Sequence, residues 1–166
     1  EHASRYVELK PNEADPHILL GDVYRAGVDL EKARSAYAKA AQVDPSNAVA
    51  LSKKGHAETF LGNYDAARAD FESASQKAIT WKIGPKNFIT FTWLYAGDVA
   101  TALAANQKLI DGIASIVTNP EQQKQGLSVL YRIRCRMSIE SNDFAAAAAA
   151  YAKHAELERA VAAELK

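Results

Sequence analysis

Several features are scarce in this 166-residue sequence, and each scarcity argues against a structural feature or a class of function. It has one cysteine, so no internal disulfide can form. Its 20 basic and 20 acidic residues cancel, whereas a general nucleic-acid binder usually has a basic excess. No apolar run approaches the ~20 residues that span a bilayer. We therefore expect no nucleic-acid partner and no membrane span in this segment.

Residues that break helices are also sparse. The sequence has eight glycines and five prolines, and alanine is abundant. This composition favours helices. Apolar residues make up 48% of the chain, which is enough for a sizeable core. We therefore expect an all-α protein.

Motifs of common catalytic and cofactor sites are absent. The sequence has no P-loop, no G-x-G-x-x-G, no H-E-x-x-H and no G-x-S-x-G. None of the histidines His2, His17, His56 and His154 has a second ligand at metal-binding spacing, and Cys135 has no histidine nearby in sequence. We expect His17 and His154 to be packing residues and Cys135 to be buried. We predict no enzyme activity, no metal and no cofactor.

What the sequence does contain is a repeated pattern of small and aromatic residues. Small residues let two helices approach closely, while an aromatic side chain fills the volume beside them. Four positions recur after 34 residues. Gly21, Ala33, Tyr37 and Ala40 correspond to Gly55, Ala67, Phe71 and Ala74. Two positions depart in the second copy, where Lys54 and Glu58 replace a leucine and a tyrosine.

The first copy, with Leu20, Gly21 and Tyr24 followed by Ala33, Tyr37, Ala40 and Pro45, resembles the tetratricopeptide repeat, a 34-residue helix–turn–helix unit. The resemblance implies a right-handed α-α superhelix (a solenoid) of about three to four antiparallel helix pairs. We expect repeats at about 14–47, 48–82, 83–119 and 120–166, the later ones degenerate with longer helices. Residues 1–12 would be the end of a preceding repeat helix, which predicts a fragment of a longer chain.

Capping and helix-breaking residues set the expected helix ends. Asp15 and Asp29 are predicted to cap two helices, Ser46 to cap a third, and Pro85 to open a fifth. Residues 79–84, including Trp81, are expected to be irregular. Tyr151 is expected to repeat the role of Tyr37. The predicted helices cover about 1–10, 15–26, 30–43, 47–61, 64–78, 85–97, 98–117, 121–140 and 144–166.

In the family that the chain resembles, first helices build the inner wall of the superhelix. Carried over by position, with Tyr95 added from a neighbouring stripe, the predicted partner-binding residues are Asp22, Arg25, Ser52, His56, Asn87, Phe91, Tyr95, Arg132 and Arg136. Whether Tyr95 instead packs against adjacent helices stays open at this point. The two arginines favour an acidic partner segment. Ile18 stands where co-chaperone members carry a lysine, so their carboxylate clamp is missing here.

These observations favour a protein–protein interaction scaffold that binds a peptide or partner segment in a concave groove. An alternative is a regulatory or sensor module of a larger signalling protein or enzyme. RNA binding by 35-residue helical repeats is a third hypothesis, which the neutral charge and the glycine pattern disfavour.

Overall fold

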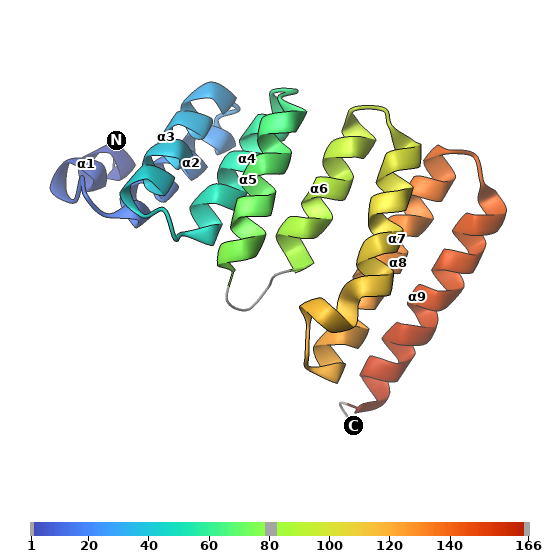
Figure 1. Cartoon of the computed structure of the whole chain (residues 1–166). Coiled ribbons are helices and arrows are strands. Elements are labelled where there is room, and N and C mark those ends of the chain that lie inside the picture. The colour runs from blue at the N-terminus through green and yellow to red at the C-terminus, as the bar shows by residue number, and fades with distance from the viewer. Residues whose placement is uncertain (1, 79–82, 165–166) are drawn as a thin grey trace. The chain divides into compact units, whose positions relative to one another are not determined.

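The computed structural model describes residues 2–78 and 83–164, which form helices joined by short connections (Figure 1). Within these ranges there are nine α-helices and no strand, which confirms the all-α expectation. The helices are α1 (His2–Leu9), α2 (Ala14–Ala26), α3 (Leu30–Val43), α4 (Ala48–Phe60), α5 (Tyr64–Lys77), α6 (Ile83–Tyr95), α7 (Val99–Ile116), α8 (Pro120–Glu140) and α9 (Phe144–Glu164).

Contacts between helices divide the chain into two compact units, residues 1–81 and 82–166. In the first unit α2 pairs with α3 and α4 with α5, while α1 packs on α2 and α3 packs on α4. In the second unit α6 pairs with α7 and α8 with α9, and α7 packs on α8. The two helices of each pair run in opposite directions (Figure 1). Each unit therefore contains two helical hairpins.

Two glycines let the helices of the first unit approach closely. A Cβ added to Gly21 on α2 would lie 2.4 Å from the ring of Tyr37 on α3. One added to Gly55 on α4 would lie 2.9 Å from the ring of Phe71 on α5. Both rings are completely buried. Each aromatic side chain thus fills the space that a side chain at the glycine would need, which confirms the predicted packing.

The second unit is built from longer helices with larger apolar residues between them. Helices α7 and α8 have 18 and 21 residues, against 13 or 14 in α2 to α5, so the predicted lengthening is confirmed. Its core consists of two clusters that join α6, α7 and α8, namely Ile83, Ile110, Ile113 and Leu130, and Leu94, Ala102, Ile133 and Met137.

The cap of α3 is confirmed, whereas the predicted cap of α4 was one residue off. Asp29 accepts a hydrogen bond from a backbone N–H in the first turn of α3, as expected. In α4, Asn47 is the capping residue, and its Oδ1 lies 3.0 Å from the amide nitrogen of Ala50. The Ser46 hydroxyl instead donates to Asp44 at 2.6 Å. Ser46 therefore belongs to the turn before the helix.

Two further helices begin earlier than the sequence predicts. Helix α2 begins at Ala14, ahead of the predicted cap Asp15, and α6 begins at Ile83. Pro16 and Pro85 are consequently each the third residue of their helix. Because the first four N–H groups of a helix have no partner within it, a proline loses no hydrogen bond there. The segment predicted to be irregular was 79–84. Its residues 79–82, which include Trp81, lie outside the described residues.

The turn inside each helix pair uses one residue in the left-handed region. Gly62 and Gly97 have φ angles of 81° and 83°, which glycine adopts readily. Asn142 has φ 58° and Val28 has φ 61°. Asparagine tolerates this region, but a β-branched side chain there is strained. Val28 is also 77% exposed, so packing does little to compensate.

The pair formed by α8 and α9 departs from the expected pattern. The repeat pattern places Tyr151 where Tyr37 is buried, yet Tyr151 is 62% exposed. Cys135, expected to be buried at the position of Gly21, is only half-buried. A cysteine carries a Cβ where Gly21 leaves room for an aromatic ring. Tyr37 is also covered by α4, whereas α9 packs on α8 alone within its unit, which leaves Tyr151 without a covering helix there.

Candidate partner-binding surfaces

The first helices of the first unit carry a polar cluster centred on Asp22. Its Oδ1 accepts a hydrogen bond from the Tyr37 hydroxyl at 2.7 Å and another from Nζ of Lys53 at 2.6 Å. Nζ of Lys53 also lies 5.8 Å from the centre of the Tyr37 ring. The three residues come from α2, α3 and α4, so the cluster joins two successive helix pairs.

The electrostatics of this cluster favour an ionised Asp22 and a neutral Tyr37. Burial raises the pKa of Asp22, but hydrogen bonds from Lys53 and Tyr37 and the charges of Lys53 and Arg25 outweigh it and lower the pKa. Burial, and then the bond to Asp22, raise the pKa of Tyr37 to about 12. Asp22 therefore accepts from two partners throughout the neutral range.

His56 lies on the same surface and is uncharged at neutral pH. Burial, and then the charges of Arg25 and Lys53, lower its pKa to about 4. Its ring meets that of Phe71 edge-on, with centroids 5.1 Å apart. Arg25 is exposed and Ser52 is half-buried. The structure thus places Asp22, Arg25, Ser52 and His56 on α2 and α4, and we call their surface the α2–α4 face.

In the second unit, two aromatic residues stand one turn apart on α6. The rings of Phe91 and Tyr95 are stacked, with centroids 6.4 Å apart and planes inclined by 28°. Phe91 is half-buried and packs against the cluster that includes Leu94 and Met137. Tyr95 is 50% exposed. Tyr95 therefore presents a ring at the surface that is held on one side by an anchored neighbour.

Helix α8 lies beside α6 and supplies the predicted arginines. Arg132 is exposed, and Arg136 is exposed with its Nε 3.0 Å from Oε1 of Glu140. Asn87 on α6 is buried, and its Oδ1 has no hydrogen-bond partner among the residues that the structure describes. We call the surface of Phe91, Tyr95, Arg132 and Arg136 the α6–α8 face, and the buried Asn87 is not part of it.

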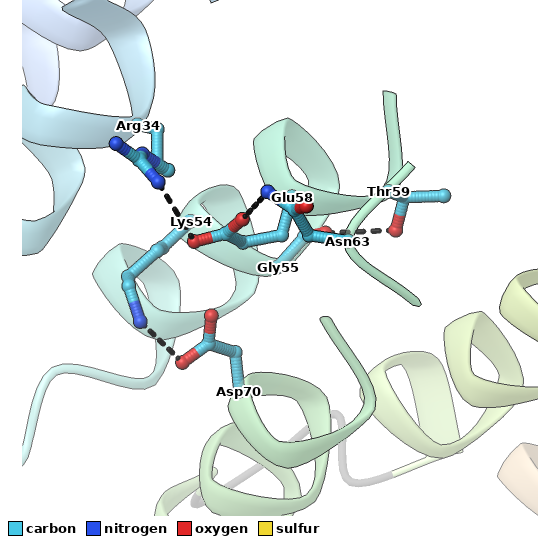
Figure 2. Close-up of polar contacts among 7 residues, drawn as sticks. All are labelled: Arg34, Lys54, Gly55, Glu58, Thr59, Asn63 and Asp70. Atoms are coloured by element: carbon cyan, nitrogen blue, oxygen red, sulfur yellow. Dashed lines mark hydrogen bonds and ion pairs between the residues drawn. The ribbon is translucent and has the colours of Figure 1, made fainter. Parts of the chain in front are cut away.

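Figure 2 shows two ion pairs, each with a buried carboxylate, that sequence reasoning missed, although it noted both departures from the repeat pattern. Glu58 accepts from the side chain of Asn63 at 2.7 Å and lies 3.9 Å from Nη1 of Arg34. Nζ of Lys54 lies 2.8 Å from Oδ1 of Asp70. Burial raises the pKa of Asp70 despite the opposing effect of Lys54. The sequence signal for these ion pairs was that the charged residues Lys54 and Glu58 stand where the repeat pattern has a leucine and a tyrosine.

Ser128 on α8 links two side chains of α9. Its Oγ lies 2.7 Å from Nδ1 of His154 and also donates to Oε1 of Glu158. A hydroxyl has one proton to donate, so the ring N–H of His154 must donate to Ser128 in this arrangement. Ser128 is 1% exposed, and the cluster holds the two helices together. His154 is therefore a packing residue, as predicted.

His17 is likewise buried, and its Nε2 lies 2.9 Å from the carbonyl oxygen of Pro11, which confirms its predicted packing role. Among the side chains that the structure describes, no three His, Cys, Asp or Glu residues gather where they could hold a metal ion. No helix in residues 2–78 and 83–164 is long and apolar enough to cross a bilayer.

Comparisons with known proteins agree with this architecture. The tetratricopeptide repeat family matches residues 14–47 and 48–76. No curated protein sequence matches the chain. Among solved structures, MamA from Desulfovibrio magneticus RS-1 is 18% identical, with a TM-score of 0.65 over 95% of this chain and 82% of that one. Cut9, in its complex with Hcn1, is 17% identical, with a TM-score of 0.65 over 95% of this chain and 28% of its own.

A third solved structure, YrrB, is 15% identical, with a TM-score of 0.55 over 96% of this chain and 93% of that one. It is described as a tetratricopeptide repeat protein with an unusual peptide-binding site. At these identities the likeness establishes the fold, that of helical-repeat solenoid proteins. Proteins built from this repeat generally mediate protein–protein interactions. Residues 14–47 and 48–76 are therefore two tetratricopeptide repeats, and the solved structures show that the rest of the chain shares the helical-repeat fold.

Proposed function

We propose that the chain is a protein-interaction scaffold that binds an acidic partner segment on the α6–α8 face. The observation that carries this proposal is the stacked pair of Phe91 and Tyr95, in which the second ring is half exposed. The scaffold acts by binding, and its side chains perform no chemical step. The peptide-binding site described for the structural neighbour YrrB supports a peptide-like partner.

The aromatic pair has the properties of a binding anchor. Phe91 is fixed by the core of the second unit, and its ring limits the freedom of Tyr95. A tyrosine that is already ordered loses little side-chain entropy when a partner covers it. Tyrosine and arginine are also enriched among the residues that dominate binding energy. Tyr95 is therefore the proposed centre of the contact.

Charge favours an acidic partner for this face, although the whole chain is neutral. The two charged side chains of this face, Arg132 and Arg136, are both basic. Arg132 is exposed, and the ion pair of Arg136 with Glu140 is a surface pair. Such pairs contribute little stability, so a partner carboxylate competes with Glu140 at small cost. Arginine also binds carboxylates in a two-pronged geometry.

The α2–α4 face is a second predicted surface with a different character. There Lys53 and Tyr37 are both bound to Asp22, and His56 is neutral. The positive charge that remains on this face is that of Arg25, which is exposed. We therefore assign the main anionic contact to the α6–α8 face.

An array of 15-residue peptides tests this proposal with the 166-residue chain. Acidic peptides are paired with copies in which every Asp and Glu is replaced by Asn or Gln. We expect the chain to retain acidic peptides selectively, and retention to weaken as salt is raised from 50 to 500 mM. Equal retention of both members of each pair would contradict the acidic-partner assignment.

A further inference from the structure

Helix α9 presents an apolar stripe that no other helix of its unit covers. The stripe runs through positions spaced by four, three, one and three residues, namely Phe144, Ala148, Tyr151, Ala152 and Ala155. Phe144 and Tyr151 are 65% and 62% exposed. Within the second unit, α9 packs on α8 alone. This spacing is that of one continuous helix face, which usually packs against another element.

The first unit shows what covers the equivalent face of α3. By the repeat pattern, Tyr151 corresponds to Tyr37, and Phe144 to Leu30. The face of α3 lies against α4, where Tyr37 packs with Ala57 and is completely buried. A neighbouring helix with a small residue opposite the tyrosine is therefore what this kind of face accepts. On α9 the face is more apolar than on α3, because Ala148 stands where α3 has Arg34.

We propose that this stripe binds the same stripe of a second copy of the chain, with the two α9 helices antiparallel. The order of residues supports a self-complementary contact. In an antiparallel pair whose two-fold axis passes between Tyr151 and Ala152, Tyr151 of each copy lies opposite Ala152 of the other. Ala148 of each copy then lies opposite Ala155 of the other. Alanines allow the two helices to approach closely, and the tyrosines fill the space beside them.

The charges at the two ends of the stripe also complement each other in this arrangement. Asp143 precedes the stripe and is exposed, and Arg159 follows it and is exposed. In an antiparallel pair, Arg159 of each copy comes beside Phe144 and Asp143 of the other. The arginine then faces both an aromatic ring and a carboxylate. A parallel pair would instead place Asp143 beside Asp143 and Arg159 beside Arg159, so the charges favour the antiparallel arrangement.

Such a contact is closed, because each copy uses the same face for its partner. Two-fold contacts of this kind produce dimers, whereas head-to-tail contacts produce open chains. The proposed contact runs from Phe144 to Arg159 and so covers about 24 Å of the helix. The inference therefore predicts a dimer of the 166-residue chain and no larger assembly. It is independent of the proposed binding of an acidic segment.

Sedimentation equilibrium on the whole chain is the first test. We expect a monomer–dimer equilibrium, with dimerisation weakened at least about tenfold by Ala152→Glu, which places a charge at the centre of the stripe. The matched control is Ala66→Glu on α5, which changes an exposed alanine of a helix to the same residue and should leave dimerisation unchanged. A chain that stays monomeric, or a dimer that survives Ala152→Glu, overturns the proposal.

Disulfide trapping provides a second test that does not depend on destabilising the contact. In a Cys135→Ser background, Ala152→Cys places one thiol next to the proposed two-fold axis. We expect this variant to form a covalent dimer at least about ten times faster than Ala66→Cys under the same oxidant. Equal rates for the two variants would overturn the proposed contact between the two stripes. Circular dichroism confirms that each variant keeps the helical content of the parent.

Discussion

Lys54 on α4 forms an ion pair with Asp70 on α5, with Nζ and Oδ1 2.8 Å apart, at a position where the repeat pattern has leucine. The Asp70 carboxylate is largely buried, and its second oxygen has no partner among the described residues. Removing the lysine would leave a buried charge without its counter-ion, which is costly. The ion pair therefore affects stability mainly because the loss of Lys54 alone would leave the charge of Asp70 buried and unpaired.

We predict that Lys54→Met lowers the free energy of unfolding by about 2–3 kcal/mol, because Asp70 is left uncompensated. This is less than the roughly 3–5 kcal/mol of a fully buried pair, since the Lys54 side chain is 26% exposed. The double variant Lys54→Met/Asp70→Leu should recover most of that loss, since apolar replacement of both partners is often neutral. Urea unfolding of the two variants and the parent measures the difference. A double variant as unstable as Lys54→Met alone would show that the ion pair does not account for the effect.

The close contact of Gly21 with Tyr37 gives a second prediction. Gly21→Ala should cost about 1–3 kcal/mol, because the new methyl group meets the buried ring of Tyr37. Gly112→Ala on α7 is the control, because an added Cβ there meets only the Ser115 hydroxyl at 3.8 Å. It should be neutral or stabilise by up to about 1 kcal/mol. Thermal unfolding that ranks Gly112→Ala below Gly21→Ala would refute this packing.

The strained turn at Val28 predicts a stabilising change. Val28→Gly should raise the free energy of unfolding by about 1 kcal/mol, since glycine adopts a φ of 61° without steric cost. Asn142 has a similar φ of 58°, but asparagine tolerates it better. Asn142→Gly should therefore gain much less. Chemical denaturation of both variants decides the matter, and a loss of stability in Val28→Gly would count against the turn geometry.

His56 predicts a dependence of stability on pH. Its pKa is about 4 when folded and near 6.5 when unfolded, so the unfolded state binds the proton more readily between these values. Stability from this group is complete above pH 6.5 and falls as the pH drops toward 4. The loss is on the order of 3 kcal/mol.

Urea unfolding at several pH values measures this loss. The slope of the free energy of unfolding against pH, between pH 6.5 and 4, should be smaller in His56→Gln than in the parent. Glutamine keeps a polar side chain but cannot titrate. The control His2→Gln changes an exposed histidine and should leave the slope unchanged. An unchanged slope in His56→Gln would mean that another group is responsible.

Much of the fold was predictable because its signals are local. Gly27, Gly62, Gly97 and Pro120 interrupt apolar periodicity in the sequence, and all nine expected helices are present with ends within a few residues. The 34-residue recurrence also identified the close approach of Gly21. These features can be predicted from the spacing of residues along one helix or one pair of helices.

What the sequence could not predict depends on contacts between helices. The bond from Lys53 to Asp22 joins residues 31 apart, and no local pattern indicates that Lys53 reaches back to α2. The lowered pKa of His56 depends on burial and on Arg25 of another helix. The exposure of Tyr151 was missed because burial at this position depends on a neighbouring helix. Helix α4 packs against Tyr37, whereas α9 packs on α8 alone within its unit.

Calorimetric titration of an acidic peptide from the array tests the central claim, that the α6–α8 face binds the partner. We predict that Tyr95→Ala and Arg136→Ala each weaken binding by at least about 1–2 kcal/mol without loss of helical content. Arg68→Ala on α5, a second helix, should bind like the parent. If Tyr95→Ala and Arg136→Ala bind like the parent while Arg68→Ala abolishes binding, the partner uses the second helices and the proposed site is wrong.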